Sequence, residues 1–145
     1  MILLDTNVLS ALMRDQPDAA VVDWLDGQPE QSIWTTAVTV FEIRTGLELL
    51  DPGRRRRRLE TAFDRLLTAH LDNRVVAFDT AAAHCAGVLV AERQRAGRTV
   101  EIRDAQIAGI AKARRAELAT GNTRHFQGMG LRLVDPWSPP RRRTC

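Results

Sequence analysis

The chain opens on an uninterrupted apolar run, Met1 to Leu4, that ends at Asp5. A run without polar alternation is typical of a strand covered on both faces, as at the centre of a parallel sheet. Similar short runs recur along the chain and predict further strands. We expect these at 32–35, 75–78, 118–120 and 131–134.

Between these runs the apolar residues recur at helical spacing. The pattern predicts helices over 8–12, 17–26, 38–50, 54–70, 80–96 and from 104 onward, with 98–103 as a connection. Gly27 and Gly97 stand where the second and fifth of these helices would end. Strands that alternate with helices predict an α/β fold, in which a parallel sheet carries helices on both faces.

The length bounds the domain organisation. A chain of 145 residues with 44% apolar content can bury one proper hydrophobic core. We find no internal repeat and no linker before the last residues. We therefore expect one domain over residues 1–137 and a basic, disordered tail over 138–145, which is rich in proline and arginine.

Cysteine use and hydropathy indicate the compartment. The two cysteines, Cys85 and Cys145, do not make a disulfide framework, which favours a reducing environment. No apolar run approaches the roughly 20 residues of a membrane span, and the start of the chain lacks the basic segment of a signal peptide. We therefore expect a cytoplasmic protein that is not attached to a membrane.

Positive charge is concentrated in two arginine runs. The net charge is +3, of which residues 54–58 contribute five positive charges and residues 141–143 three, so the remainder carries −5. Such runs attract polyanions, although a solvated helix face and a disordered tail would explain them as well. The first run would also oppose the dipole of its own helix, which hints at a role outside the helix.

Acidic residues follow the predicted strands. In open parallel sheets ligands gather at the carboxyl ends of the strands, where Asp5 stands, although Asp5 could equally be a helix N-cap. Glu42 has two readings as well. It could close a capping box with Thr39, or it could lie inside a helix that begins earlier, at Thr35 or Thr36.

Two further polar residues occupy comparable positions. Asp104 is either an N-cap or a first-turn acid of its helix, and Asn122 follows the fourth strand. Asp79 ends the third strand and is expected to act as a cap. Two carboxylates ~5 Å apart at an effective dielectric of ~20 repel by about 3 kcal/mol. If Asp5, Glu42 and Asp104 share one cleft, a hard divalent cation such as Mg²⁺ would offset that repulsion.

Four segments, in this order, resemble the PIN-domain ribonucleases, and above all the VapC-type toxins of bacterial toxin–antitoxin pairs and the related FitB-like proteins. The segments are 3–9 (LLDTNVL), 39–42 (TVFE), 104–108 (DAQIA) and 119–126 (ATGNTRHF). The likeness runs from Met1 to about Trp137. It implies a three-layer α/β/α fold whose five-stranded parallel sheet has the strand order 3-2-1-4-5.

The resemblance also implies an activity and its partners. Members of the family cleave RNA with Mg²⁺ or Mn²⁺, form dimers, and are neutralised by a small antitoxin whose C-terminal segment covers the active site. We therefore expect an endoribonuclease that acts as the toxin of such a pair. Its expected partners are an RNA substrate and a cognate antitoxin, in a homodimer or a toxin–antitoxin hetero-oligomer.

The resemblance also assigns individual residues to the metal site. Asp5, Glu42 and Asp104 match the three acidic metal-site positions of the family. Asn122 matches a fourth position that is Asp in some relatives and Asn in others, and it adds no negative charge. Arg103 stands where a small or apolar residue is usual, so it would contact RNA phosphate or pair with a site acid.

The chemistry that these residues suggest is metal-assisted phosphodiester hydrolysis. Asp5 and Asp104 would hold Mg²⁺ directly or through water, and Glu42 would bind a second ion or orient the attacking water. Thr6 would orient Asp5 by a hydrogen bond. Arg124 would steady a phosphate.

Two other functions are open at this point. A phosphatase of the haloacid-dehalogenase type or a receiver domain would transfer a phosphoryl group through Asp5. The phosphatase pattern, however, requires a second Asp at the position of Asn7. A non-catalytic protein that binds RNA or a partner is compatible with every pattern above. The histidines at 70, 84 and 125 stand too far apart in sequence to suggest a shared site, and His125 is expected in an exposed loop.

Overall fold

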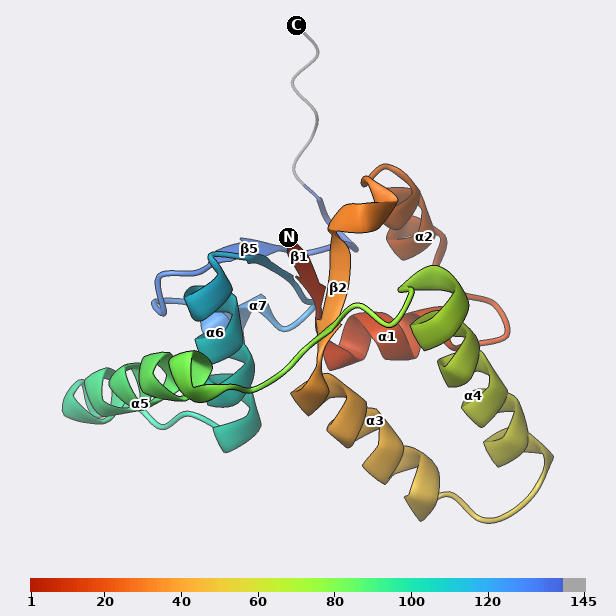
Figure 1. Cartoon of the computed structure of the whole chain (residues 1–145), viewed down its shortest axis with the longest axis horizontal. Helices are drawn as coiled ribbons and strands as arrows, with labels where there is room; N and C mark the ends of the chain where they lie inside the picture. The colour runs from red at the N-terminus through yellow and green to blue at the C-terminus, as the bar shows by residue number, and fades with distance from the viewer. Residues whose placement is uncertain (140–145) are drawn as a thin grey trace, which may run out of the picture.

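Five short strands form one parallel sheet in the order β3-β2-β1-β4-β5, as expected (Figure 1). In this computed structural model the described residues are 1–139, so most of the tail predicted at 138–145 lies outside them. Within the described part no helix is long and apolar enough to cross a membrane. The strands are β1 (Ile2–Leu4), β2 (Ile33–Thr36), β3 (Val75–Val76), β4 (Glu117–Ala119) and β5 (Arg132–Val134).

The connections between these strands are mainly helical. They contain α1 (Thr6–Leu12), α2 (Ala19–Asp26), α3 (Ala37–Leu49), α4 (Arg54–Arg65), α5 (Thr80–Arg95), α6 (Ile102–Arg114) and α7 (Thr123–Phe126). A short 3-10 turn, Glu30–Ser32, precedes β2, and a π-helical turn, Leu66–His70, extends α4. The helix predicted from 54 to 70 therefore widens in its last turn.

The central strand β1 is buried on both faces, as its apolar run predicts. Leu4 belongs to the core on one side of the sheet, together with Val8 of α1 and Phe63 of α4. Leu3 belongs to the core on the other side, together with Ile107 of α6. The sheet therefore lies between two helical layers, and the expected three-layer α/β/α architecture is confirmed.

Helices α5 and α6 approach each other closely at Gly109. A β-carbon placed on Gly109 would lie 2.5 Å from the Ala82 carbonyl oxygen and 2.7 Å from the Ala86 β-carbon. Only glycine fits against the alanine-rich face of α5 at this distance. The position of α6 relative to α5 is therefore set by small residues.

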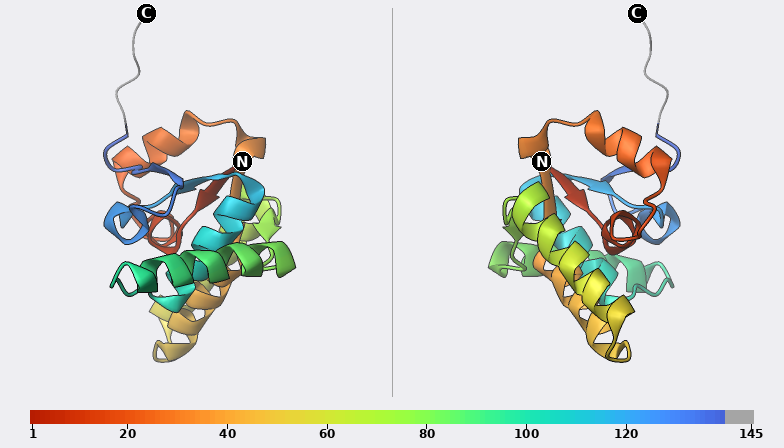
Figure 2. Two further views of the ribbon diagram at one scale, coloured as in Figure 1. Left: turned by 90° about the vertical axis from the view of Figure 1, so that its left-hand side faces the viewer. Right: turned by 90° about the vertical axis from the view of Figure 1, so that its right-hand side faces the viewer.

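Helices α3 and α4 form an antiparallel pair that extends beyond the sheet in both views of Figure 2. An ion-pair network ties the pair together. The Arg56 guanidinium lies 2.6 Å from Glu48 of α3 and 2.8 Å from Glu60 of its own helix, and Arg44 of α3 pairs with both glutamates. Arg56 is therefore a brace between the two helices.

Several predicted boundaries were wrong by a few residues. The second helix begins at Ala19 rather than at 17, because Asp18 caps it. The third strand is reduced to Val75–Val76 at the edge of the sheet. The predicted connection 98–103 is also shorter, because α6 already begins at Ile102.

Candidate active site at the carboxyl edge of the sheet

Asp5 ends the central strand and is held by the neighbouring strand β4. Its backbone amide donates to the Ala119 carbonyl at 3.0 Å. Its side chain is only 5% exposed. Oδ1 accepts from the Thr6 amide at 2.8 Å, and Oδ2 accepts from the Thr120 hydroxyl at 2.7 Å. Asp5 is thus both the N-cap of α1 and a buried carboxylate at the carboxyl end of the sheet.

Asn7 joins the loops that follow β1 and β4. Its amide nitrogen donates to Asp5 Oδ2 and to Thr120 Oγ1, both at 3.1 Å. Its amide oxygen accepts from the Gly121 backbone at 2.8 Å. Sequence reasoning missed Asn7 and Thr120 as site residues, although Asn7 stands two positions after Asp5 and Thr120 ends a predicted strand.

A chain of threonine hydroxyls connects α1 to the start of α3. Thr36 caps α3 by accepting from the Thr39 amide at 3.0 Å, so the alternative capping box from Thr39 to Glu42 does not form. The Thr6 hydroxyl donates to Thr39 Oγ1 at 3.5 Å. Thr6 therefore orients Asp5 only through its backbone amide, whereas its hydroxyl contacts α3. Glu42 lies inside α3, half-buried, one turn beyond Thr39.

Asp104 lies in the first turn of α6 rather than at its cap. Glu101 is the N-cap, because its carboxylate accepts from the amides of Arg103 and Asp104 at 2.9 and 3.1 Å. Asp104 Oδ2 lies 3.2 Å from His125 Nδ1. His125 is exposed, as predicted, but it lies on the short helix α7 next to Asp104 rather than in a loop.

The three acids interact electrostatically. Burial raises the pKa of Asp5, and hydrogen bonds from Thr120, Thr6 and Asn7 partly offset that rise. Burial also raises the pKa of Glu42, with Arg103 acting in the opposite direction and Asp5 and Asp104 adding to the rise.

Asp104 behaves in the same way. Burial and the charge of Asp5 raise its pKa, and His125 lowers it. Each of the three acids thus has a raised pKa, and for Glu42 and Asp104 the charge of Asp5 contributes to the rise. Residues that lie far apart in sequence, on the β1 edge, α3 and α6, share one electrostatic environment.

The supporting residues lie around these acids with different contacts. Arg103 pairs with Glu101 at 3.0 Å, not with a site acid, although its charge lowers the pKa of Glu42. Asn122 is exposed, and its backbone amide donates to the Thr120 hydroxyl at 3.0 Å. Arg124 is exposed on α7. Asn122 thus lies next to the site, and Arg124 stands one residue before His125 on α7.

Asp79 lies outside the site, as its edge strand predicts. Its carboxylate caps α5 by accepting from the Ala82 amide at 3.0 Å, and it pairs with Arg114 at 3.2 Å. The aspartate that follows the edge strand thus caps a helix and forms an ion pair, and it takes no part in the site. It provides a control for the acids near β1.

The donor set is compatible with a divalent cation in its chemistry. Among residues 1–139 no three His, Cys, Asp or Glu side chains are close enough, as they stand, to hold a metal ion together. Carboxylate oxygens are nevertheless the ligands that Mg²⁺ and Mn²⁺ take in proteins. Because the charge of Asp5 raises the pKa of Glu42 and of Asp104, a cation bound among these acids would offset their repulsion.

The fold and the site define a class: three-layer α/β proteins with acids gathered where the central parallel strand ends. The family model described as PIN domain matches residues 2–130, and the chain belongs to the PIN domain family.

Similarity to individual proteins extends over almost the whole chain. Plasmid stability protein StbB of Pseudomonas syringae pv. tomato is 39% identical and covers 94% of this chain and 99% of its own length. VapC ribonuclease Y4jK of Sinorhizobium fredii is 35% identical and covers 96% of this chain and 99% of its own length. A solved structure of FitAB bound to an IR36 DNA fragment superposes with a TM-score of 0.87 at 30% identity and covers 98% of this chain and 99% of that one.

Proposed function

We propose that this protein is a divalent-metal-dependent endoribonuclease that hydrolyses RNA phosphodiester bonds as the toxin of a toxin–antitoxin pair. The observation that carries the proposal is the group of three acids, from three separate elements, near the end of β1, where the charge of Asp5 raises the pKa of both Glu42 and Asp104. The whole-length similarity to a VapC ribonuclease supports the same activity. Divalent-metal dependence is general among PIN-domain VapC nucleases.

Asp5 and Asp104 are the residues that we assign to a Mg²⁺ or Mn²⁺ ion, directly or through water. Asp5 is held in one orientation by Thr120, Asn7 and the Thr6 amide, which favours a fixed ligand position. A bound divalent ion lowers the pKa of water and neutralises charge that develops on phosphoryl oxygens. Glu42, on α3, would bind a second ion or orient the attacking water.

The remaining polar groups would bind substrate or adjust charge. Arg124 and Asn122 are exposed, and their guanidinium and amide groups would hold a phosphate or a water beside the acids. His125 contacts Asp104 and would hold that carboxylate in place. Arg103, beside Glu101, would contact the RNA backbone at the mouth of the site.

The partner that we propose is a small antitoxin. The solved FitAB structure to which this chain is similar is a two-component assembly bound to DNA. By analogy this chain would form a homodimer or a hetero-oligomer with its antitoxin, whose C-terminal segment would cover the acids.

The test is cleavage of single-stranded RNA by the partner-free protein. We expect cutting in Mg²⁺ or Mn²⁺ that EDTA abolishes. Asp5→Asn and Asp104→Asn should reduce the rate by about 100-fold or more, since even outer-shell partners of metal ligands cost 10–100-fold. Asp79→Asn is the matched control and should cut normally, because Asn caps a helix as well as Asp.

Two results would contradict the proposal. Cutting that survives EDTA would indicate a contaminating nuclease. If the protein cuts RNA with neither Mg²⁺ nor Mn²⁺, it would instead be a non-catalytic RNA- or partner-binding protein on the same fold.

A further inference from the structure

The exposed face of α4 carries an unusual concentration of arginine. The helix contains six arginines, five of them consecutive, against two acids, Glu60 and Asp64. At 3.6 residues per turn, Arg54, Arg55, Arg57 and Arg58 cover one side of the helix, and Arg65 falls on the same side two turns further on. All five are exposed. We call these five residues the α4 basic face.

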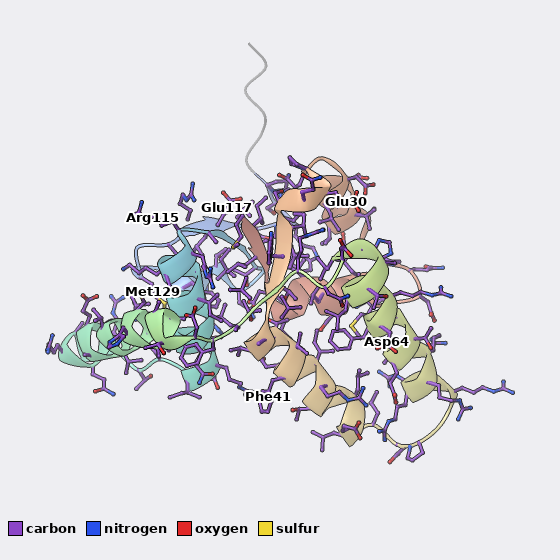
Figure 3. The ribbon with its side chains drawn as sticks, viewed as in Figure 1. Glu30, Phe41, Asp64, Arg115, Glu117 and Met129 are labelled. Carbon is purple, nitrogen blue, oxygen red and sulfur yellow. The ribbon has the colours of Figure 1, made fainter. Side chains whose placement is uncertain are left out.

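The ion pairs separate this face from the structural brace described above. Arg56 points the other way and joins α3 to α4 through Glu48 and Glu60. Arg58 pairs with Asp15 at 3.0 Å. Within residues 1–139 no carboxylate lies at ion-pair distance from Arg54, Arg55 or Arg57, although Asp51 precedes them in sequence. In Figure 3 long side chains tipped with nitrogen project from α4 into open space.

These arginines do not serve the helix that carries them. Cations at a helix N-terminus are unfavourable, because the helix dipole is positive there. The N-cap residue of α4 is Gly53, which offers no side-chain hydrogen bond to the first turn. A stable helix start usually has a capping side chain and acids in its first turn. The start of α4 has neither and carries arginines instead. The arginines therefore have a role that stability does not explain.

The start of the α4 basic face lies near the C-terminal ends of α1 and α3, and both of these helices also lead from the acids. Helix α1 begins directly after Asp5 and leads to Asp15, which pairs with Arg58. Helix α3 carries Glu42, and Glu48 near its end binds Arg56. At 1.5 Å per residue, α1 spans about 10 Å and the part of α3 beyond Glu42 a similar length. The basic face is thus separated from the acids by a distance that a few nucleotides would bridge.

The chemistry of the face fits a phosphate backbone better than an apolar protein surface. Guanidinium groups bind phosphate oxygens in a bidentate manner. Interfaces between proteins usually have an apolar centre, and among residues 1–139 the exposed large hydrophobic side chains all lie outside α4. We propose that the α4 basic face binds the backbone of the RNA strand several nucleotides from the scissile phosphate and so anchors the substrate. This inference rests on the proposed ribonuclease function.

The test compares two double variants that lose the same charge. Arg54→Gln/Arg57→Gln removes two unpaired arginines of the basic face. Arg95→Gln/Arg98→Gln removes two exposed arginines at and just beyond the end of α5, on the other side of the molecule (Figure 1). Binding is measured in EDTA, so that metal-dependent cutting cannot consume the RNA. The probes are single-stranded RNAs of about 4 and about 20 nucleotides.

We expect the α4 variant to bind the long RNA at least tenfold more weakly and the short RNA normally, because only the long strand reaches α4. The slope of log Kd against log salt should fall by about 1.4, the value for two lost phosphate contacts on a single strand. The α5 variant should show neither change. The midpoint of thermal unfolding of the α4 variant should be equal or higher, which shows that the folded state is intact.

Several results would overturn the inference. They are equal losses on both RNAs, equal losses in both variants, or an unchanged salt slope. Weaker binding of an acidic antitoxin with unchanged RNA binding would assign the face to the partner instead. Failure of the ribonuclease proposal is recognisable separately, because the wild-type protein would then not cut RNA in Mg²⁺ or Mn²⁺ whatever the α4 variant binds.

Discussion

The Thr120 hydroxyl donates a 2.7 Å hydrogen bond to Oδ2 of Asp5, a residue 115 positions away in sequence. Thr120 is fully buried at the end of β4, and its oxygen also accepts from Asn7 and from the Asn122 amide. One hydroxyl thus links the central strand to the loop after β4. It also offsets part of the effect of burial on the pKa of Asp5.

Replacement of this hydroxyl should therefore affect stability and activity together. We expect Thr120→Val to lower the free energy of unfolding by about 1–3 kcal/mol, because buried polar partners lose their hydrogen bonds. The pKa of Asp5 should rise further, so the acidic limb of the pH–rate profile for RNA cleavage should move to higher pH. Thr120→Ser keeps the hydroxyl and should restore the wild-type profile. An unchanged profile in the valine variant would show that Thr120 does not act on Asp5.

The raised pKa of Asp104 gives a prediction for the stability of the metal-free chain. Between the ordinary value of 3.8 and the raised value, the folded chain binds more protons than the unfolded chain, so stability falls as pH rises through this window. Asp104→Asn should remove that loss and raise the free energy of unfolding at pH 7 by a few tenths to about 1 kcal/mol. The gain should disappear below pH 3.8.

Chemical denaturation of both proteins across pH would measure this difference. Asp79→Asn is again the control, since it keeps its cap and loses only its pairing with Arg114. A destabilised Asp104→Asn protein at neutral pH would mean that its charge is favourable in the folded chain.

Divalent ions should make the wild-type chain more stable than Asp104→Asn, which is the reverse of the order expected for the metal-free proteins. A ligand that binds only the folded state stabilises it by about 2.7 kcal/mol at one hundred times its Kd. Mg²⁺ or Mn²⁺ should therefore raise the midpoint of thermal unfolding of the wild-type chain and of Asp79→Asn, and it should have much less effect on Asp5→Asn and Asp104→Asn. Differential scanning fluorimetry with and without EDTA provides the measurement. Equal shifts in all four proteins would place the ion elsewhere.

The contact between α5 and α6 allows a matched pair of substitutions. Gly109→Ala would drive a methyl group into the Ala82 carbonyl, so it should cost at least 1–3 kcal/mol, the usual range for overpacking. Gly87→Ala, in α5, meets nothing within 4 Å and should instead stabilise by about 0.5–1 kcal/mol through helix propensity. Urea denaturation of the two variants would test the packing directly. Similar values for both would contradict the close approach.

The pattern of apolar runs was sufficient to predict the order of the five strands and of the helices between them, except the short α7, because each strand is a short, continuous run. Exact boundaries were harder to predict, since they depend on caps. Asp104 was expected to be the cap or a first-turn acid of α6, and the cap is Glu101, which is not among the residue types that usually cap helices. The choice between Thr36 and Thr39 depended on the end of β2. The strand order came from the family resemblance rather than from periodicity.

The acids were predictable and their supports were not. Asp5, Glu42 and Asp104 stand at recognisable positions, but the hydrogen bonds of Thr120, Asn7 and His125 depend on how loops distant in sequence meet. Such contacts have no local signature, because Asn, Thr and His are ordinary residues near turns and helix ends.

The glycine contact of α6 has a consequence beyond stability. Gly109 is five residues, about one and a half turns, after Asp104 on the same helix. Whatever tilts α6 away from Ala82 and Ala86 would swing its first turn and change the gap across which Asp104 faces Asp5. The separation between Asp104 and Asp5 in the proposed site thus depends on packing among three of the smallest residues in the protein, Gly109, Ala82 and Ala86.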